Sequence, residues 1–144
     1  MNTSVDSVGV VPRQEDFDAI RSTTLDYVDG WYNGDAERMR RSLHPDLMKR
    51  TVVRESKGRK WQLRRPTTAE MMVRFTEEGG GAELPEPERV YQITIVDIFR
   101  HIAMVKCVSP DFVDYIQLAN IDDGGWVIVN VLFELREGEF EPAS

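Results

Sequence analysis

The fold is decided by the stretch Tyr27-Val-Asp-Gly-Trp-Tyr-Asn-Gly-Asp-Ala-Glu-Arg-Met-Arg-Arg-Ser-Leu-His-Pro-Asp46, which joins a long amphipathic segment to a shorter one. Asn33-Gly34 predicts the end of a helix, because glycine readily adopts the left-handed conformation that satisfies the last carbonyls. Asp35 can then cap a second helix by accepting hydrogen bonds from its free amides. Pro45 disfavours helical geometry at His44, so we expect the second helix to end there.

The rest of the chain separates into a helical part before this turn and a β-rich part after it. Apolar side chains recur at steps of three and four residues upstream, which predicts a helix over residues 15–32. The sequence closes with segments of apolar period two, rich in Val, Ile and aromatic residues, which predict an antiparallel meander over residues 90–99, 102–109, 112–122 and 126–135. Asp122-Asp-Gly-Gly125 is the clearest hairpin turn within it.

Between these two parts the sequence predicts a hairpin and a third helix. Residues 47–65 alternate apolar and basic side chains around Ser56-Lys-Gly-Arg59, as in a hairpin with one face buried and one in water. Thr67-Thr-Ala-Glu70 resembles a capping box at the start of a short helix. The glycines and prolines of residues 79–88 predict an acidic loop after that helix. Helices laid against a curved antiparallel sheet would enclose an apolar hollow.

Length and composition indicate one globular domain. The chain has 144 residues, and we expect a single domain over residues 1–144 with an ordered core at about 14–136. No apolar run approaches the roughly 20 residues that a membrane span needs, so no membrane partner is expected. The first residues do not resemble a signal peptide, and the single cysteine, Cys107, excludes an internal disulfide. A cytoplasmic location is therefore predicted.

The charge is distributed unevenly along the chain. The net charge of −7 argues against a general affinity for nucleic acid, which Lys and Arg mainly provide. Residues 38–65 nevertheless hold eleven Lys or Arg against two acids, a local charge of +9. The basic hairpin at 49–65 is either a solvated face or a site for an acidic partner or an anionic ligand. Arg50 is the residue we would test for binding an anion.

The order of these segments, with the blocks 27–46 and 114–130, resembles the nuclear transport factor 2-like superfamily, and within it the small bacterial branch described as putative lumazine-binding. The resemblance covers residues 17–134. It implies an α+β fold in which a cone-like, curved antiparallel sheet wraps around N-terminal helices, as in cystatin-like proteins, and which often pairs through its sheet as a homodimer. The same cone carries ketosteroid isomerase, scytalone dehydratase and many non-catalytic pockets, so function must be argued from the site.

We expect a small-molecule-binding protein whose ligand lies in the hollow of the cone. Tyr27 and Trp31 offer flat surface and a hydroxyl to a ligand, although they could simply pack the helix on the sheet. Asp97 lies in an apolar run, so it is either outward-facing or functionally perturbed. Gln117 and Asn130 could supply amide donors inside the hollow or be polar residues of a sheet face. The expected ligand-binding residues are Tyr27, Trp31, His44, Arg50, Asp97, Asp114, Gln117 and Asn130.

The alternative is a cofactor-free isomerase, dehydratase or hydrolase. His44 or Asp46 would then be the catalytic base and Tyr27 the polarising donor, since histidine titrates near neutral pH. An imidazole at a helix C-terminus also interacts favourably with the helix dipole, so His44 has a structural interpretation too. A third interpretation is an interaction module that holds a partner on the sheet face or the basic hairpin. Neither a cofactor nor a metal site is expected, because the two histidines and the cysteine lack paired-ligand spacing.

Overall fold

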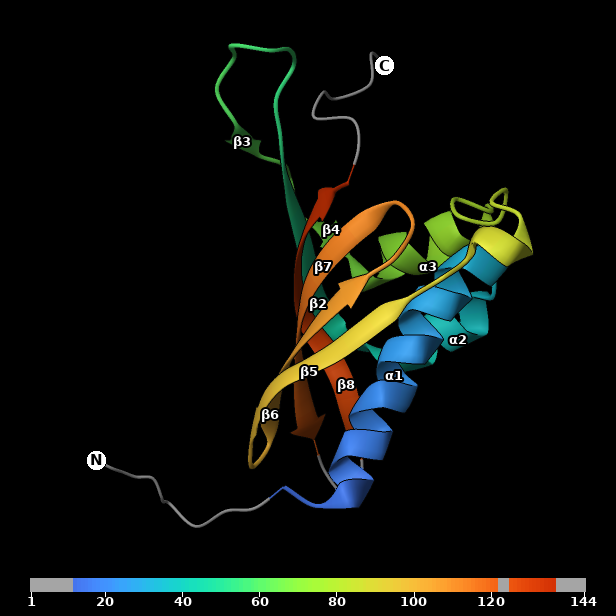
Figure 1. Cartoon of the computed structure of the whole chain (residues 1–144), viewed down its shortest axis with the longest axis vertical. Helices are drawn as coiled ribbons and strands as arrows, with labels where there is room; N and C mark the ends of the chain where they lie inside the picture. The colour runs from blue at the N-terminus through green and yellow to red at the C-terminus, as the bar shows by residue number, and fades with distance from the viewer. Residues whose placement is uncertain (1–11, 122–124, 137–144) are drawn as a thin grey trace.

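A computed structural model of the chain describes residues 12–121 and 125–136, in which three helices cover one face of a curved sheet (Figure 1). The helices and the 3-10 turn are α1 (Gln14–Asn33), α2 (Ala36–Ser42), α3 (Ala69–Glu77) and η1 (Glu86–Glu88). The strands are β2 (Leu43–Val53), β3 (Gln62–Leu63), β4 (Thr67–Thr68), β5 (Gln92–Phe99), β6 (Ile102–Val108), β7 (Phe112–Ile121) and β8 (Gly125–Leu135). This is the predicted α+β class. No helix in the described ranges is long and apolar enough to cross a membrane.

α1 and α2 pack closely because a glycine lets their backbones come near each other and because oppositely charged side chains pair between them. Gly34 ends α1 with a φ of 66°, in the left-handed conformation that the sequence predicted. A Cβ on Gly30 would lie 3.2 Å from the backbone nitrogen of Met39, so glycine permits the crossing of α1 with α2. Arg38 of α2 then forms salt bridges with Asp26 (3.0 Å) and Asp29 (2.5 Å) of α1. These acids therefore join the two helices rather than facing only water.

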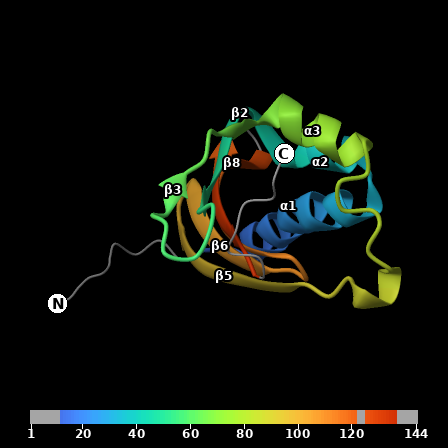
Figure 2. The ribbon, with the colours of Figure 1, turned by 90° about the horizontal axis from the view of Figure 1, so that it is seen from above.

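The sheet has the strand order β3-β2-β8-β7-β6-β5, and β4 pairs with β2. Strands β5 to β8 form the predicted antiparallel meander, with β5–β6, β6–β7 and β7–β8 as neighbours. β2 runs parallel to β8, so the sheet is mixed and not wholly antiparallel. Seen from above, the strands curve around α1 (Figure 2). The concave face of the sheet therefore holds the core.

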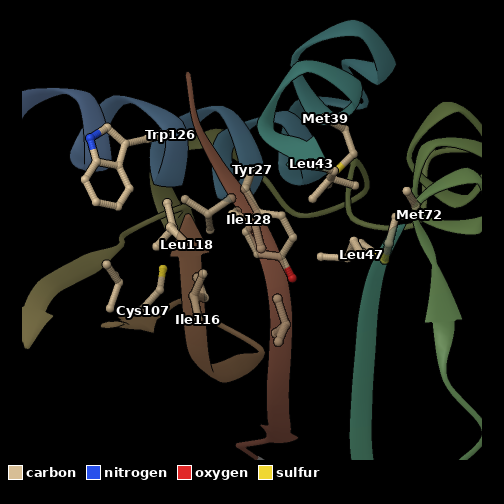
Figure 3. Packing of buried hydrophobic residues seen from close by; sticks show 14 of the residues in the cluster. Tyr27, Met39, Leu43, Leu47, Met72, Cys107, Ile116, Leu118, Trp126 and Ile128 are labelled. Atoms are coloured by element: carbon tan, nitrogen blue, oxygen red, sulfur yellow. The ribbon is translucent and has the colours of Figure 1, made fainter. Parts of the chain in front are cut away.

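Side chains that alternate along the strands separate a buried face from an exposed one. In β6, Ala103, Val105 and Cys107 are buried, whereas Ile102 and Met104, which alternate with them, are exposed. The buried set meets the inner side of the helices, and Figure 3 shows Tyr27 of α1 among the core side chains of β2, β7 and β8. Described residues of this cluster with less than 2% exposure include Ile20, Tyr32, Met39, Leu47, Ile116 and Ile128.

Two sequence predictions about local structure were wrong. The second helix ends at Ser42 rather than His44, because Leu43 already pairs with Ile128 of β8 and buries its side chain in the sheet. Pro45 lies where the β2–β8 register shifts, a position where a strand tolerates the missing amide. Thr68, not Thr67, caps α3, accepting a hydrogen bond from the Met71 amide.

The remaining differences concern lengths and limits. The second strand of the basic hairpin is the two-residue β3, although its predicted pairing with β2 is confirmed through Val52 and Leu63. The predicted turn at 122–125 falls mostly on residues 122–124, outside the described residues, and Ile121 pairs with Gly125 on either side of it. The acidic loop after α3 packs against α1, because Arg89 donates to Asn33 and to loop carbonyls.

Candidate functional site

A buried lysine lies at the centre of the cone. Lys49 is on the inward face of β2, and the residue as a whole is 8% exposed. Its Nζ donates a hydrogen bond to the hydroxyl of Tyr27 at 2.5 Å. The same nitrogen lies 4.6 Å from the ring centroid of Phe133, 5.0 Å from that of Tyr27 and 5.6 Å from that of Phe112. Aromatic faces attract a cation, so these rings compensate part of the cost of burying the ammonium group.

Asp114 of β7 is the buried acid of the same region, with 2% exposure. Burial raises the pKa of this carboxyl, while the positive charge of Lys49 acts in the opposite direction. Burial likewise lowers the pKa of Lys49, against the attraction of Asp114. The two groups interact electrostatically without a salt bridge within 4.0 Å, and Oδ1 of Asp114 has no hydrogen-bond partner.

Two further groups of this interior cluster titrate only at high pH. Burial raises the pKa of the Tyr27 phenol well above its ordinary value, with Asp114 adding to the effect. Burial also raises the pKa of the Cys107 thiol to about 12, so this thiol stays protonated at neutral pH. Tyr27 is therefore a neutral hydroxyl that can both accept from Lys49 and donate. We call Tyr27, Lys49, Cys107 and Asp114 the interior cluster.

Lys49 lines two cavities. A small cleft of about 10 Å³, enough for one water molecule, lies between α1 and β7 and is bounded by Tyr27, Lys49 and Asp114. On the other side opens a groove of about 790 Å³ between β2, α3 and the β3–β4 segment. The groove is lined by Lys49, Thr51, Val53, Gln62, Leu63, Arg64, Arg65, Pro66, Thr67, Met71, Phe75 and Phe133. Among the residues that the structure describes, three cations and no acid line this groove.

Only part of the predicted site faces these cavities. Tyr27 and Asp114 belong to the interior cluster, and Trp31 lines the small cleft beside them. Asp97, Gln117 and Asn130 also come together, but on the outer face of the sheet, where they border a hollow of about 340 Å³. There Asn130 donates a hydrogen bond to Gln117 at 3.1 Å.

The predicted catalytic set is not assembled around Tyr27. His44 and Asp46 lie at the start of β2, where the Asp46 amide donates to Nδ1 of His44 at 2.9 Å and the Asp46 side chain is 93% exposed. The Tyr27 hydroxyl instead meets Lys49. No hydrogen bond or ion pair recorded for the described residues links His44 or Asp46 to that hydroxyl.

Arg50 lies one residue away from the position that faces the interior. It is paired with the exposed Leu132 of β8, so its side chain belongs to the outer side of β2, opposite to that of Lys49. The sequence left open whether the basic segment that includes Lys49 is a solvated hairpin face or a site for an acidic partner or an anion, and it did not predict that Lys49 is buried. The sequence did hold an indication that Lys49 is buried, because Lys49 and Thr51 lie on the same strand face as the apolar Leu47. Met48 and Val52 on the other face are also apolar, so periodicity alone could not assign the buried side.

No cluster that could hold a metal was found in residues 12–121 and 125–136, where groups of three or more His, Cys, Asp or Glu side chains are absent. The polar groups of the interior cluster are an amine, a phenol, a thiol and a carboxyl from four different elements. Such groups can donate and accept hydrogen bonds and exchange protons with a ligand that reaches them. The geometry therefore defines a pocket-bearing cone with an ionisable centre.

Comparison with solved structures shows the class of fold. An NTF-2 like protein of unknown function from Silicibacter pomeroyi DSS-3 is similar with a TM-score of 0.69 and 18% identity, covering 88% of this chain and 100% of that one. An NTF2-like protein of unknown function from Methylobacillus flagellatus KT has a TM-score of 0.61 and 22% identity, covering 91% and 98%. A ketosteroid isomerase-like protein from Erwinia carotovora atroseptica SCRI1043 has a TM-score of 0.58 and 11% identity, covering 87% and 99%.

These likenesses define an NTF2-like, cystatin-like cone. The family model described as "Putative lumazine-binding" matches residues 15–134, and the chain belongs to that family. The resemblance seen in the sequence is thereby confirmed. No curated protein matched the chain.

Proposed function

We propose that the protein binds a small organic anion with a flat, apolar body in the groove beside Lys49. The observation that carries this proposal is the groove's charge: Lys49, Arg64 and Arg65 line it, and no Asp or Glu among the described residues does. Its volume of about 790 Å³ lies within the range of about 300–1,000 Å³ that is usual for small-molecule sites. The family's description as lumazine-binding, which concerns a flat heterocycle, agrees with a ligand of this shape.

The walls and the inner end of the groove favour different parts of such a ligand. Met71 and Phe75 of α3, with Phe133 of β8, offer apolar surface to a ring. Lys49 at the inner end is held away from water, where a charge interacts more strongly with its partner than at the surface. A carboxylate reaching it would accept a charge-assisted hydrogen bond. Arg65 is exposed near the mouth and would mainly steer the anion inward.

A thermal-shift screen with matched pairs tests the proposal. Each pair is an aromatic or heteroaromatic carboxylate and its neutral carboxamide. The acids should raise the melting temperature more than their amides, because only the acids gain from the buried cation. Lys49→Met should abolish this difference, whereas Arg50→Gln, which removes a cation from the other face of the same strand, should preserve it. Equal shifts for acids and amides, or an undiminished difference in Lys49→Met, would contradict the proposal.

The proposal also includes a homodimer that forms through the outer face of the sheet. Val96, Phe99, Ile102, Met104, Tyr115 and Leu132 expose apolar side chains on the outer face of the sheet, with exposed fractions from 42% to 59%. Monomeric proteins rarely leave so many neighbouring apolar side chains in water. Asp97 and Lys106 place opposite charges on this face, so a second copy related by a two-fold axis can match them. We call this surface the outer apolar face and propose a second copy of the chain as its partner.

A cytoplasmic location and the lack of nucleic-acid partners complete the proposal. The single Cys107 is buried and free, so the fold does not depend on a disulfide formed in an oxidising compartment. The net charge of −7 disfavours contact with phosphate backbones. Cell fractionation tests the location, and retention in a salt-free DNA mobility assay would contradict the second statement.

A further inference from the structure

We propose that Lys49 forms a reversible covalent imine with ligands that carry an aldehyde or ketone beside their anionic group. The inference rests on the proposed function, because the anion-binding groove would deliver the carbonyl to the amine. It assigns a nucleophile to the interior of the cone and names a class of ligand, the oxo-acids and formyl-acids. The supporting observations are the position of Lys49, its surroundings and the water-sized cleft beside it.

The position of Lys49 meets the first requirement, which is contact with both a ligand space and a proton donor. Lys49 lines the large groove, and it also lines the small cleft on its other side. The hydroxyl of Tyr27 lies 2.5 Å from its nitrogen, within reach of an oxygen that would be added to the carbonyl carbon. Phe133 borders the groove 4.6 Å from the same nitrogen and limits how the ring of a ligand can approach.

The surroundings meet the second requirement, which is a larger neutral fraction of the amine than an exposed lysine has. The amine exchanges between an ammonium form, which binds the anion, and a neutral form, which attacks the carbonyl. Burial lowers the pKa of Lys49. The rings of Tyr27, Phe112 and Phe133 surround its nitrogen, and because their faces attract the ammonium form they act against this shift. The titratable groups that face it are Tyr27 from α1, Asp114 from β7 and Cys107 from β6, and Arg64 and Arg65 line the groove. Asp114 opposes the shift by favouring the ammonium form, and burial nevertheless dominates.

The small cleft meets the third requirement, which is a place for the leaving water. The lone pair of the neutral amine attacks the carbonyl carbon, a C–N bond forms, and the carbonyl oxygen takes up a proton to give a carbinolamine. A second proton then reaches that oxygen, the C–O bond breaks, and one water leaves as the C=N bond forms. The two hydrogens of the amine thus end in the released water, and no oxidant or reductant is consumed. The cleft of about 10 Å³ beside Asp114 has room for one water, and the unpaired Oδ1 of Asp114 can accept from it.

The other lysines of the chain provide an internal reference. Lys57 and Lys60 are exposed on the β2–β3 hairpin, and Lys106 lies on the outer side of β6. None of these three lines the groove. A reaction directed by the groove should therefore select Lys49, whereas a reaction that follows exposure alone should avoid it.

Reductive trapping on the wild-type protein tests the inference. The probe is 4-formylbenzoate with sodium cyanoborohydride near neutral pH, and the adducts are located by peptide mass spectrometry. We expect a reduced adduct on Lys49 that forms faster than on Lys57, Lys60 or Lys106, by about tenfold for each unit by which its pKa is depressed relative to theirs. An excess of 4-methylbenzoate, which has the charge and shape of the probe but no carbonyl, should protect Lys49 alone.

The outcomes separate this inference from the proposed function. Saturable binding of 4-methylbenzoate that depends on Lys49, together with labelling of the exposed lysines only, would overturn the imine and leave the anion site standing. Labelling of Lys49 that 4-methylbenzoate does not reduce would support the nucleophile and contradict the groove as the route to it. Failure of both acids to bind and to label would overturn both statements. Lys49→Arg, which keeps the cation, should bind 4-methylbenzoate but give no adduct at this position.

Discussion

At the scale of single residues, the register of β2 decides which of two adjacent cations, Lys49 or Arg50, is buried inside the cone. The two residues carry the same charge, yet their side chains lie on opposite faces of β2. The inward Lys49 loses water and gains aromatic neighbours, so its protonation is tied to folding. The sequence shows a basic segment, but it does not show that β2 pairs with β8, so it could not indicate which of the cations is buried.

The buried amine predicts a specific pH dependence of stability. A lysine whose pKa is lower in the folded state binds fewer protons there than in the unfolded chain, so its contribution to stability rises as the pH increases toward the unfolded value of about 10.4. The free energy of unfolding in urea should therefore increase less between pH 7 and pH 9.5 in Lys49→Met than in the wild type. Lys57→Met, an exposed counterpart, should follow the wild type. Parallel profiles for Lys49→Met and the wild type would contradict the buried amine.

At the scale of elements, the long periodic segments were predictable and the short or composite ones were not. The apolar steps of α1 and the alternation of β5 to β8 each repeat over many residues, so tertiary contacts only adjusted their ends. β3 has two residues and owes its existence to pairing with β2, which no local pattern encodes. The parallel pairing of β2 with β8 joins segments far apart in the sequence, so no local pattern could predict it either.

The loop after α3 owes its conformation to an element distant in sequence. Gly79 follows the C-cap of α3 with a φ of 83°, and its amide donates a hydrogen bond to the Thr76 carbonyl. A Cβ on either Gly80 or Gly81 would overlap the indole of Trp31 on α1. The loop can therefore lie flat on the Trp31 indole only because these residues are glycines. This contact and the positive φ of Gly79 explain the sequence Gly79-Gly80-Gly81.

Substitution of the buried Gly81 should expose this contact. Gly81→Ala should destabilise the protein by about 1–3 kcal/mol, because the indole must move to admit a methyl group. The same change in a Trp31→Leu background should cost less, since the smaller side chain leaves room, and a double-mutant cycle of urea unfolding free energies measures the difference. Additive costs would show that Gly81 and Trp31 do not share a contact. Gly81 does not have a positive φ, so alanine adds no left-handed backbone strain there and its cost reports the indole contact.

At the scale of the whole molecule, the two faces of the sheet carry different groups, and we propose that the concave face holds the ligand and the outer apolar face a second copy. The concave face carries the interior cluster, and the outer apolar face carries the hollow where Asp97, Gln117 and Asn130 meet. The sequence analysis assigned both groups to one site. The alternation of side chains shows which residues share a face of the sheet, but not which of the two faces is the concave one. Registers such as Met104 with Gln117 and Gln117 with Asn130 assign these amides to the outer side.

The outer apolar face predicts the oligomeric state. The wild-type protein should elute as a dimer in size-exclusion chromatography with light scattering. Met104→Asp should yield a folded monomer, because it buries an unpaired carboxylate in the interface at a cost of about 3 kcal/mol in each copy. Val90→Asp changes an apolar residue with 71% exposure outside the sheet, and should remain dimeric. A monomeric wild type, or a dimer that survives Met104→Asp, would contradict a second copy on this face.

The central claim is that the groove delivers an anionic head group to the buried amine of Lys49. A crystal structure of the protein with the best-binding carboxylate tests it most directly. We predict the ligand ring between α3 and Phe133, with a carboxylate oxygen about 2.8 Å from Nζ of Lys49. A carboxylate bound instead in the hollow of the outer apolar face, or in the groove with its charged end turned away from Lys49, would contradict the account.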